Sequence, residues 1–279
     1  MLGRFGKDAG SLLGVEIAPD SVRIIQLQGR RGRHRVTACV SEPLGAGAAS
    51  DDPGVVVSAL RNALHRSGSR QRGAVLALPG SQVICKRCRL PSGLGPAQLE
   101  AQLLAEAERL FPFPLEDLAL DFQGLGASVE QEGCQDVFVA ACRQSALEPL
   151  EQLTAQAGLR LMAVEVDSIA LQRIAPEFAT GDQALLRLEA SDATLHCWPR
   201  EQPPQRHALA LPAGSWDAVQ PLPAAALAVV GSQVLAPARL ELLSKAFGVP
   251  CQSLPPLPGL AEGDGGMALA YALALGGLR

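Results

Sequence analysis

The feature that most constrains the fold is a run of three short strand-like segments that opens the chain and occurs again near its end. Both runs combine β-branched and other apolar residues with turn-forming Gly, Pro and Asp. They comprise residues 12–17, 22–28 and 33–40, and residues 184–188, 194–198 and 207–211. A helix with four-residue apolar spacing follows the first run at 52–67, and a helix ending at Gly248 follows the second. The repetition predicts two α/β domains.

Between the two runs lies another pattern, in the order strand, helix, strand, strand, helix, strand. Its segments are residues 83–90, 96–110, 118–125, 136–143, 145–157 and 161–166. Pro96 suits the first turn of a helix, and Gly158 suits a helix C-terminus. This order is that of a ferredoxin-like module. We therefore expect residues 82–165 to form one module inserted into the first domain.

Composition indicates a globular protein with aliphatic cores and no metal site. Of 279 residues, 48% are hydrophobic and only 4% are aromatic, and the length suits two domains. The apolar stretch 267–278 is about half the length needed to cross a bilayer, so we expect a buried C-terminal helix. Seven cysteines without paired spacing indicate free thiols. Cys85 and Cys88 lack the second ligand pair of a structural zinc site.

The net charge of −4 hides an uneven distribution along the chain. Residues 1–95 carry a net charge of +8 and the remainder −12, and the segment 61–89 contains seven basic residues and no acidic one. Such a face is either solvated or in contact with an anionic lipid surface or an acidic partner. Nucleic acid is not expected, because the basic residues are not interleaved with aromatic side chains that stack on bases.

Motifs spread along the chain resemble those of one known family. They open the chain, flank and line the predicted module, and close the chain. They are 12–17 with 21–23, 78–81 with Lys86 and 90–91, 106–108 with 111–116 and 120–122, 166–168 with 170–171, and Gly231 with Pro237 and 240–250. In these motifs the chain is similar to the PilM family, the actin-like, FtsA-related inner-membrane assembly proteins of type IV pili.

This resemblance implies an α/β, two-domain actin-like ATPase fold of the ribonuclease-H-like type. Residues 11–81, completed by 166–181, would form the first domain, and 82–165 the inserted ferredoxin-like module. Residues 182–279 would form the second domain. Only the segment 211–225 stands where the family has a helical subdomain, so we expect the second domain to be truncated.

The resemblance also implies a nucleotide site, and the residues found there are unsuited to it. In actin-like ATPases two hairpins hold phosphates through backbone N–H groups, and acidic residues hold Mg²⁺. The degenerate positions are Glu16, Ala18 and Pro19 in the first hairpin, Arg187, Glu189 and Asp192 in the second, and Gly231 on the adenosine side. A carboxylate facing a phosphate at about 4 Å repels it by on the order of 4 kcal/mol. We expect no cofactor and no catalytic residue, and we interpret His196 and Cys197 as strand packing.

A binding partner follows from the same resemblance. In the family, the N-terminal cytoplasmic tail of a bitopic inner-membrane protein, PilN, docks as an extended peptide between the first domain and the module. The matching residues here are Val83, Ile84, Cys85, Lys86 and Arg87 in a strand, and Phe111, Pro112, Phe113, Pro114 and Leu115 in a loop. Phe111 and Phe113 are equally consistent with side chains that only pack the module onto the domain.

The sequence therefore predicts a non-catalytic cytoplasmic adaptor in type IV pilus assembly, peripheral at the inner membrane and bound to the N-terminal peptide of a PilN-like protein. Two alternatives stay open. One is a working actin-like ATPase or nucleotide-sensing switch. The other is a component of the type II secretion assembly platform, although that protein continues into a membrane span whereas this chain stops at Arg279. The sequence leaves open whether the chain forms a homo-oligomer.

Overall fold

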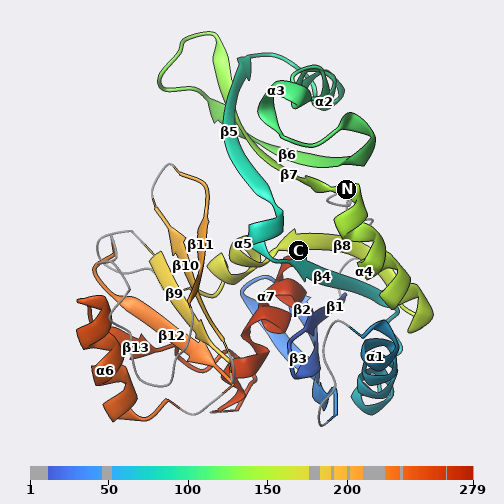
Figure 1. Cartoon of the computed structure of the whole chain (residues 1–279), viewed down its shortest axis with the longest axis vertical. Helices are drawn as coiled ribbons and strands as arrows, with labels where there is room; N and C mark the ends of the chain where they lie inside the picture. Colours follow the sequence, from blue (N-terminus) through green and yellow to red (C-terminus); the bar gives the residue numbers. More distant parts are fainter. Residues whose placement is uncertain are drawn as a thin grey trace.

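The computed structural model describes residues 12–45, 52–175, 183–189, 192–199, 202–209, 224–232, 235–261 and 263–278. These residues form three sheets (Figure 1). Two five-stranded sheets, each with its helices, make a first and a second lobe that lie side by side. A three-stranded sheet with two helices makes a smaller module above the first lobe. The two predicted α/β domains are thereby confirmed. The predicted short segment 211–225 lies almost wholly outside the described residues.

The sheet of the first lobe has the strand order β3-β2-β1-β4-β8. Its strands are β1 (Leu13–Ile17), β2 (Ser21–Arg30), β3 (Arg33–Pro43), β4 (Gly73–Leu78) and β8 (Arg160–Val166). Strands β1, β4 and β8 run parallel, and β1 to β3 form the antiparallel meander that the sequence predicts. Because β8 is the last strand, its outer edge is not paired with another strand of this sheet.

Helices cover both faces of this sheet. Helices α1 (Pro53–Ser67) and α4 (Gln144–Gln156) pack on one face, and α7 (Ala268–Gly276) packs on the other. Asp52 begins α1 because its side chain accepts hydrogen bonds from the N–H groups of Gly54 and Val55. Gly68 ends it in the left-handed conformation, with φ of 62°.

The predicted C-terminal helix is confirmed, but it belongs to the first lobe. Helix α7 lies against β1, and its alanines allow a close approach. Gly14 of β1 completes that approach, because a Cβ there would overlap the carbonyl oxygen of Ala270. The predicted second domain, 182–279, is therefore wrong at its C-terminal end. No helix among the described residues is long and apolar enough to span a membrane.

The second lobe repeats the arrangement of the first, with strand order β11-β10-β9-β12-β13. Its strands are β9 (Gln183–Leu188), β10 (Ala193–Trp198), β11 (Gln205–Leu209), β12 (Leu227–Gly231) and β13 (Cys251–Ser253). Strands β9 to β11 form an antiparallel meander, and β12 and β13 continue the sheet in parallel with β9. Helix α6 (Pro237–Phe247) covers one face, and a short 3₁₀ turn at Asp264–Met267 leads back to α7.

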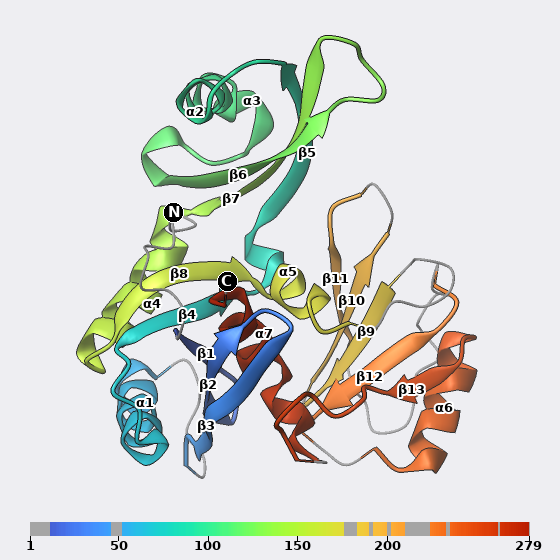
Figure 2. The ribbon, with the colours of Figure 1, turned by 180° about the vertical axis from the view of Figure 1, so that it is seen from behind.

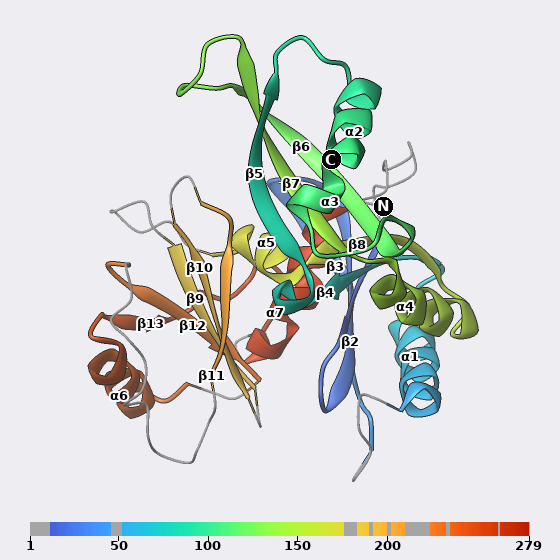
Figure 3. The same cartoon turned by 45° about the horizontal axis from the view of Figure 1, so that its top comes forward.

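The inserted module is smaller than the sequence predicts. Its sheet contains β5 (Ile84–Pro91), β7 (Cys134–Arg143) and β6 (Leu118–Ala127), in that order. Helices α2 (Pro96–Ala105) and α3 (Ala107–Leu110) cover one face of it (Figure 3). The order of elements along the chain matches the ferredoxin-like pattern, but the last helix and strand do not join the module.

The predicted module boundary at residue 165 is wrong because β8 pairs with β4 instead of with the module. The parallel ladder runs from Gly73 opposite Arg160 to Leu78 opposite Val166. Helix α4 packs its apolar face, including Leu150 and Leu153, into the core of the first lobe. The sequence pattern fixes the order of strands but not their partners, since a buried parallel strand suits either sheet.

The close contact between β1 and α7 gives a stability prediction. We expect Gly14→Ala to lower the free energy of unfolding by about 3 kcal/mol or more, because backbone atoms of the helix must move. Gly124→Ala is the matched control, since nothing lies within 4 Å of its added Cβ and its φ is not positive. Chemical denaturation of both variants measures the difference. Equal stability of the two variants would contradict the packing described.

Candidate functional site

A buried network of four charged side chains occupies the space between the two lobes, where the β1–β2 and β9–β10 hairpins meet. Glu16 comes from β1 and Arg23 from β2, where they are directly opposite each other. Arg187 comes from β9, and Glu189 follows that strand. These four residues are between 3% and 13% exposed.

Every pair of opposite charges in this network is in contact. Arg23 binds both carboxylate oxygens of Glu189, with Nη1–Oε1 and Nη2–Oε2 distances of 3.0 and 2.9 Å. Arg187 Nη2 donates to Glu189 Oε1 at 2.7 Å and also to Glu16 Oε1. Arg23 Nη1 lies 3.6 Å from Glu16 Oε1 and donates to the carbonyl oxygen of Gly266 at 2.8 Å. The two lobes are thus joined by ion pairs between residues 166 to 171 positions apart.

The network is electrically balanced, and its pKa shifts reflect this. Burial alone would raise the pKa of Glu189, but hydrogen bonds from Arg23 and the charge of Arg187 lower it below its ordinary 4.5. Burial likewise opposes the charged forms of both arginines, but the carboxylates of Glu16 and Glu189 outweigh it and raise the pKa of each. The attraction between opposite charges in the network thus outweighs the effect of burial on Arg23, Arg187 and Glu189.

The backbone donors of the two hairpins are also engaged. Ala18 N–H donates to Ser21 O at 2.8 Å, and Pro19 has no N–H. Glu189 N–H donates to Asp192 O at 2.9 Å. In an actin-like ATPase such donors would point to phosphate, whereas here they close their own turns.

A magnesium nucleotide does not fit the residues present. The sequence predicts that repulsion between carboxylates and phosphate excludes the nucleotide. The structure shows a different situation for these carboxylates. The carboxylates of Glu16 and Glu189 are paired with arginine. A cavity of about 510 Å³ remains between the lobes, and Glu16, Arg187 and Glu189 line it together with the turn at residues 18–19. The paired charges, rather than a lack of space, oppose a magnesium nucleotide. Asp192 is exposed and outside the network. Among the described residues, no group of three or more His, Cys, Asp or Glu side chains could hold a metal ion.

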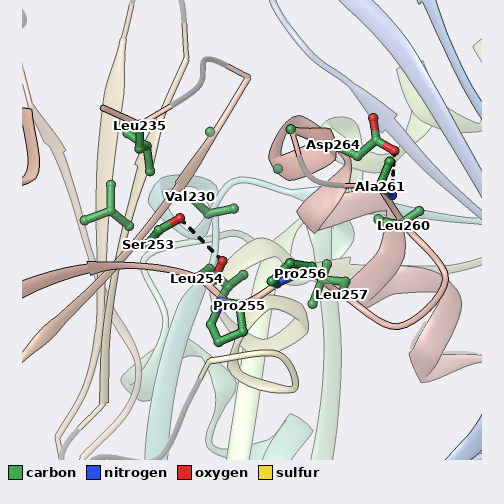
Figure 4. A pocket seen from close by; sticks show the side chains of 14 residues that line it. Val230, Leu235, Ser253, Leu254, Pro255, Pro256, Leu257, Leu260, Ala261 and Asp264 are labelled. Atoms are coloured by element: carbon green, nitrogen blue, oxygen red, sulfur yellow. Dashed lines mark hydrogen bonds between the residues drawn. The ribbon is translucent and has the colours of Figure 1, made fainter. Parts of the chain in front are cut away.

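A cavity of about 330 Å³ persists on the adenosine side, next to Gly231 (Figure 4). Its lining is mainly apolar and includes Val230, Leu235, Leu254 and Pro255. Among the described residues of its lining, the one carboxylate is that of Asp264, which accepts a hydrogen bond from Ala261 N–H at 3.1 Å. This cavity could admit a small apolar group. It lies next to the ion network, because Gly266, which follows the lining residue Gly265, accepts a hydrogen bond from Arg23.

A second polar connection joins the lobes near α5 (Asp167–Gln172). Asp167 accepts hydrogen bonds from Gly80 N–H at 2.8 Å and from Arg206 Nε at 3.0 Å. Ser168 Oγ lies 2.8 Å from His196 Nδ1, and His196 stacks on Trp198. Burial lowers the pKa of His196 to about 4, so the imidazole is neutral at pH 7. The interpretation of His196 as strand packing is consistent with this burial.

A groove runs between the first lobe and the uncovered face of the module. Its first part, about 190 Å³, is lined by Leu147 of α4, by β8 and by Ala119 and Cys142 of the module. Its second part, about 490 Å³, is lined by Phe138, Trp198 and other residues of both lobes and the module. The two parts share Asp121, Ala140, Glu165 and Val166. They therefore form one continuous groove along the free edge of β8.

Of the predicted partner-binding residues, Val83 lines this groove, and Ile84 and Cys85 line a smaller pocket beside Arg206. The others lie elsewhere. Phe111 is 2% exposed in the core under α2 and α3, where Phe113 also packs.

Lys86 and Arg87 lie on opposite faces of the module's sheet. Lys86 donates to Leu110 O and lies over the Phe111 ring on the helix-covered face. Arg87 pairs with Asp136 on the other face, where it stands directly opposite Phe138. The loop 111–115 thus lies on the helix-covered side of the module. Side chains along β5 alternate between the two faces of the sheet, and Ile84, Lys86 and Cys88 face the helices.

The groove residues that sequence reasoning missed lie on the opposite face of the module's sheet. Ala119, Phe138, Ala140 and Cys142 point into the groove, while Val137, Val139 and Ala141 point into the module's core. The continuous apolar run 137–142 is the sequence feature that could have indicated this second apolar face. A strand that is apolar on both faces needs cover on both, and the helices of the module cover only one.

The ion network gives a prediction with a pH dependence. We expect Glu189→Gln to lower the free energy of unfolding by about 3 kcal/mol at pH 7, since it leaves a buried positive charge without its partner. The pKa of Glu189 is lowered in the folded state, so its contribution is fully present above pH 4.5 and is lost as the pH falls below that value. The difference from the wild type should therefore shrink in acid.

The matched control for that experiment is Glu42→Gln. Glu42 pairs with Arg66, which is 57% exposed, so we expect a change below about 1 kcal/mol. Urea denaturation at pH 7 and pH 4 measures both variants. A loss at Glu189 no larger than the loss at Glu42 would contradict the role assigned to the network.

Comparison with known proteins agrees with this architecture. The family of type IV pilus assembly protein PilM matches residues 14–184. Among solved structures, a PilM–PilN type IV pilus biogenesis complex is 21% identical, with a TM-score of 0.71 over 96% of this chain and 98% of that one.

Two further structures share the fold. The cytoplasmic domain of EpsL, an inner-membrane component of the type II secretion system of Vibrio cholerae, is 17% identical, with a TM-score of 0.50 over 95% of both chains. The ethanolamine utilization protein EutJ of Carboxydothermus hydrogenoformans is 12% identical, with a TM-score of 0.50 over 95% of this chain and 89% of that one. The fold is actin-like, and the chain belongs to the PilM family of type IV pilus assembly proteins.

Proposed function

We propose that the chain is a non-catalytic adaptor in type IV pilus assembly. The observation that carries this proposal is the network of Glu16, Arg23, Arg187 and Glu189, which pairs the charges of the two hairpins with one another. A protein that keeps its two lobes without a site for phosphate retains its surfaces for binding. On this proposal the chain acts in the cytoplasm and reaches the inner membrane through a partner.

The partner in this proposal is the N-terminal cytoplasmic segment of a PilN-like membrane protein. The family assignment and the fold shared with a PilM–PilN complex support this choice. The continuous groove suits an extended peptide, because β8 offers an unpaired strand edge. Main-chain pairing along such an edge gives affinity, and pockets for alternate side chains give specificity.

Apolar side chains make the groove suitable for apolar residues of such a segment. Ala119, Ala140 and Leu147 line the floor near the first lobe. Phe138 and Trp198 line the wider second part, where Trp198 is fixed by a hydrogen bond from its Nε1 to Ser168 O at 2.9 Å. The partner segment would thus contact the module and both lobes at once.

The absence of nucleotide binding is the first test of this proposal. We expect no saturable binding of Mg-ATP at micromolar concentrations, because phosphates would have to displace buried ion pairs. Isothermal titration calorimetry of the purified chain measures this. Binding with a micromolar dissociation constant would refute the adaptor proposal in favour of a nucleotide-sensing switch.

The position of the groove is the second test. A peptide with the N-terminal sequence of the PilN-like partner is titrated into the chain, with fluorescence anisotropy as the measurement. We expect Phe138→Ala to weaken binding about tenfold or more, as truncation of a buried aromatic anchor does. Phe113→Ala is the matched control on the opposite face of the module and should change binding less than about threefold. Weakening by the control alone would place the partner at the loop 111–115.

A further inference from the structure

The β2–β3 hairpin carries a dense set of arginines outside the site described above. Four arginines, Arg30, Arg31, Arg33 and Arg35, fall within six residues at its tip. The ladder places Arg30 directly opposite Arg33, and Gln28 opposite Arg35. Residues opposite each other share a face, and so do alternate residues along a strand. Arg30, Arg33 and Arg35 therefore lie on one face of the hairpin, with Arg31 at the turn.

The other face of the hairpin is attached to the body of the protein. His34 Nε2 lies 2.6 Å from the hydroxyl of Tyr271 in α7, and that hydroxyl donates to Pro258 O at 3.2 Å. Val36 packs into the core beneath α7. Figure 2 shows the hairpin passing in front of α7. The arginine face is consequently held rigidly and turned away from the protein.

No carboxylate of a described residue pairs with these arginines. Within the part of the chain that the structure describes, Arg30, Arg31 and Arg33 form no ion pair, and Arg35 donates only to the amide oxygen of Gln28 at 2.8 Å. All four are exposed. Like charges directly opposite each other destabilise a strand pair. An anionic surface against Arg30 and Arg33 would reduce the repulsion between them.

We propose that this hairpin face binds the anionic surface of a phospholipid bilayer. Guanidinium groups on one face of a hairpin can contact several phosphates of a lipid surface at once, and each basic residue near such a surface strengthens binding about fivefold. A nucleic acid is disfavoured because the hairpin has no aromatic residue on which bases could stack. The site differs from the segment 61–89 singled out by charge alone, since Arg66, Arg87 and Arg89 of that segment pair with carboxylates.

The experiment uses the full chain without any partner, so its result is independent of the proposed adaptor function. Co-sedimentation is measured with vesicles of phosphatidylglycerol mixed with phosphatidylcholine, and with vesicles of phosphatidylcholine alone. We expect binding to the mixed vesicles only, weakening as salt rises. The triple variant R30Q/R31Q/R33Q should lose affinity roughly a hundredfold, because three contributions of about fivefold multiply.

The matched control is R61Q/R70Q/R72Q, which removes the same charge from a different surface and should retain affinity within about fivefold. Thermal melts of both variants show whether they fold, and all exchanged positions are exposed. The proposal is overturned by equal binding of the wild type to neutral vesicles, or by equal losses in the two variants. It is also overturned if the hairpin variant loses binding to single-stranded RNA but not to vesicles.

Discussion

The buried ion network between the lobes determines how the rest of this molecule is arranged. Arg23 and Glu16 belong to the first lobe, and Arg187 and Glu189 to the second, so the contacts of these four residues across the cleft are ion pairs or charge-assisted hydrogen bonds. Such a network adds little net stability compared with apolar side chains, because desolvation offsets the attraction. Its effect is geometric. Four charges that must all be paired permit only one relative position of the two hairpins.

That position fixes the walls of the groove. The edge of β8 and the face of the module form one side, while Trp198 and Pro199 come from the second lobe. A change in the angle between the lobes would separate these walls. The second polar connection, from Gly80 through Asp167 to Arg206, reinforces the same arrangement at the entrance to the module. The two connections together hold three separately folded units as one binding surface.

Much of the fold could be predicted from the sequence, because local signals decide it. Asp52 with Pro53 began α1, Gly248 ended α6, and both meanders were visible as alternating strands between turn residues. Partners of strands were not predictable in the same way. Strand β8 reads as a continuation of the module along the chain, yet it pairs with β4.

For the site, the sequence drew attention to the positions where the two hairpins meet, but it could not show how their charges are paired. Glu189 suggests repulsion when considered alone. Its partner Arg23 lies 166 positions away, and only the meeting of the two hairpins brings them together. The position of the groove between the module and the lobes could not be predicted from the sequence for a related reason. The faces of β5 and β7 differ in what covers them, and that depends on where α2 and α3 pack.

The replacement of a ligand by side chains has a consequence for regulation. In an actin-like ATPase the phosphates bridge two hairpins, so the closed arrangement depends on ligand concentration. On the proposed function, the bridging groups here are side chains of the protein itself, and the arrangement of the two hairpins does not depend on a ligand. Regulation of the protein would then depend on what binds to its surfaces. A groove for a membrane protein's tail and an arginine face for lipid would act as two linked contacts, and their combined affinity exceeds either alone because the second forms at high effective concentration.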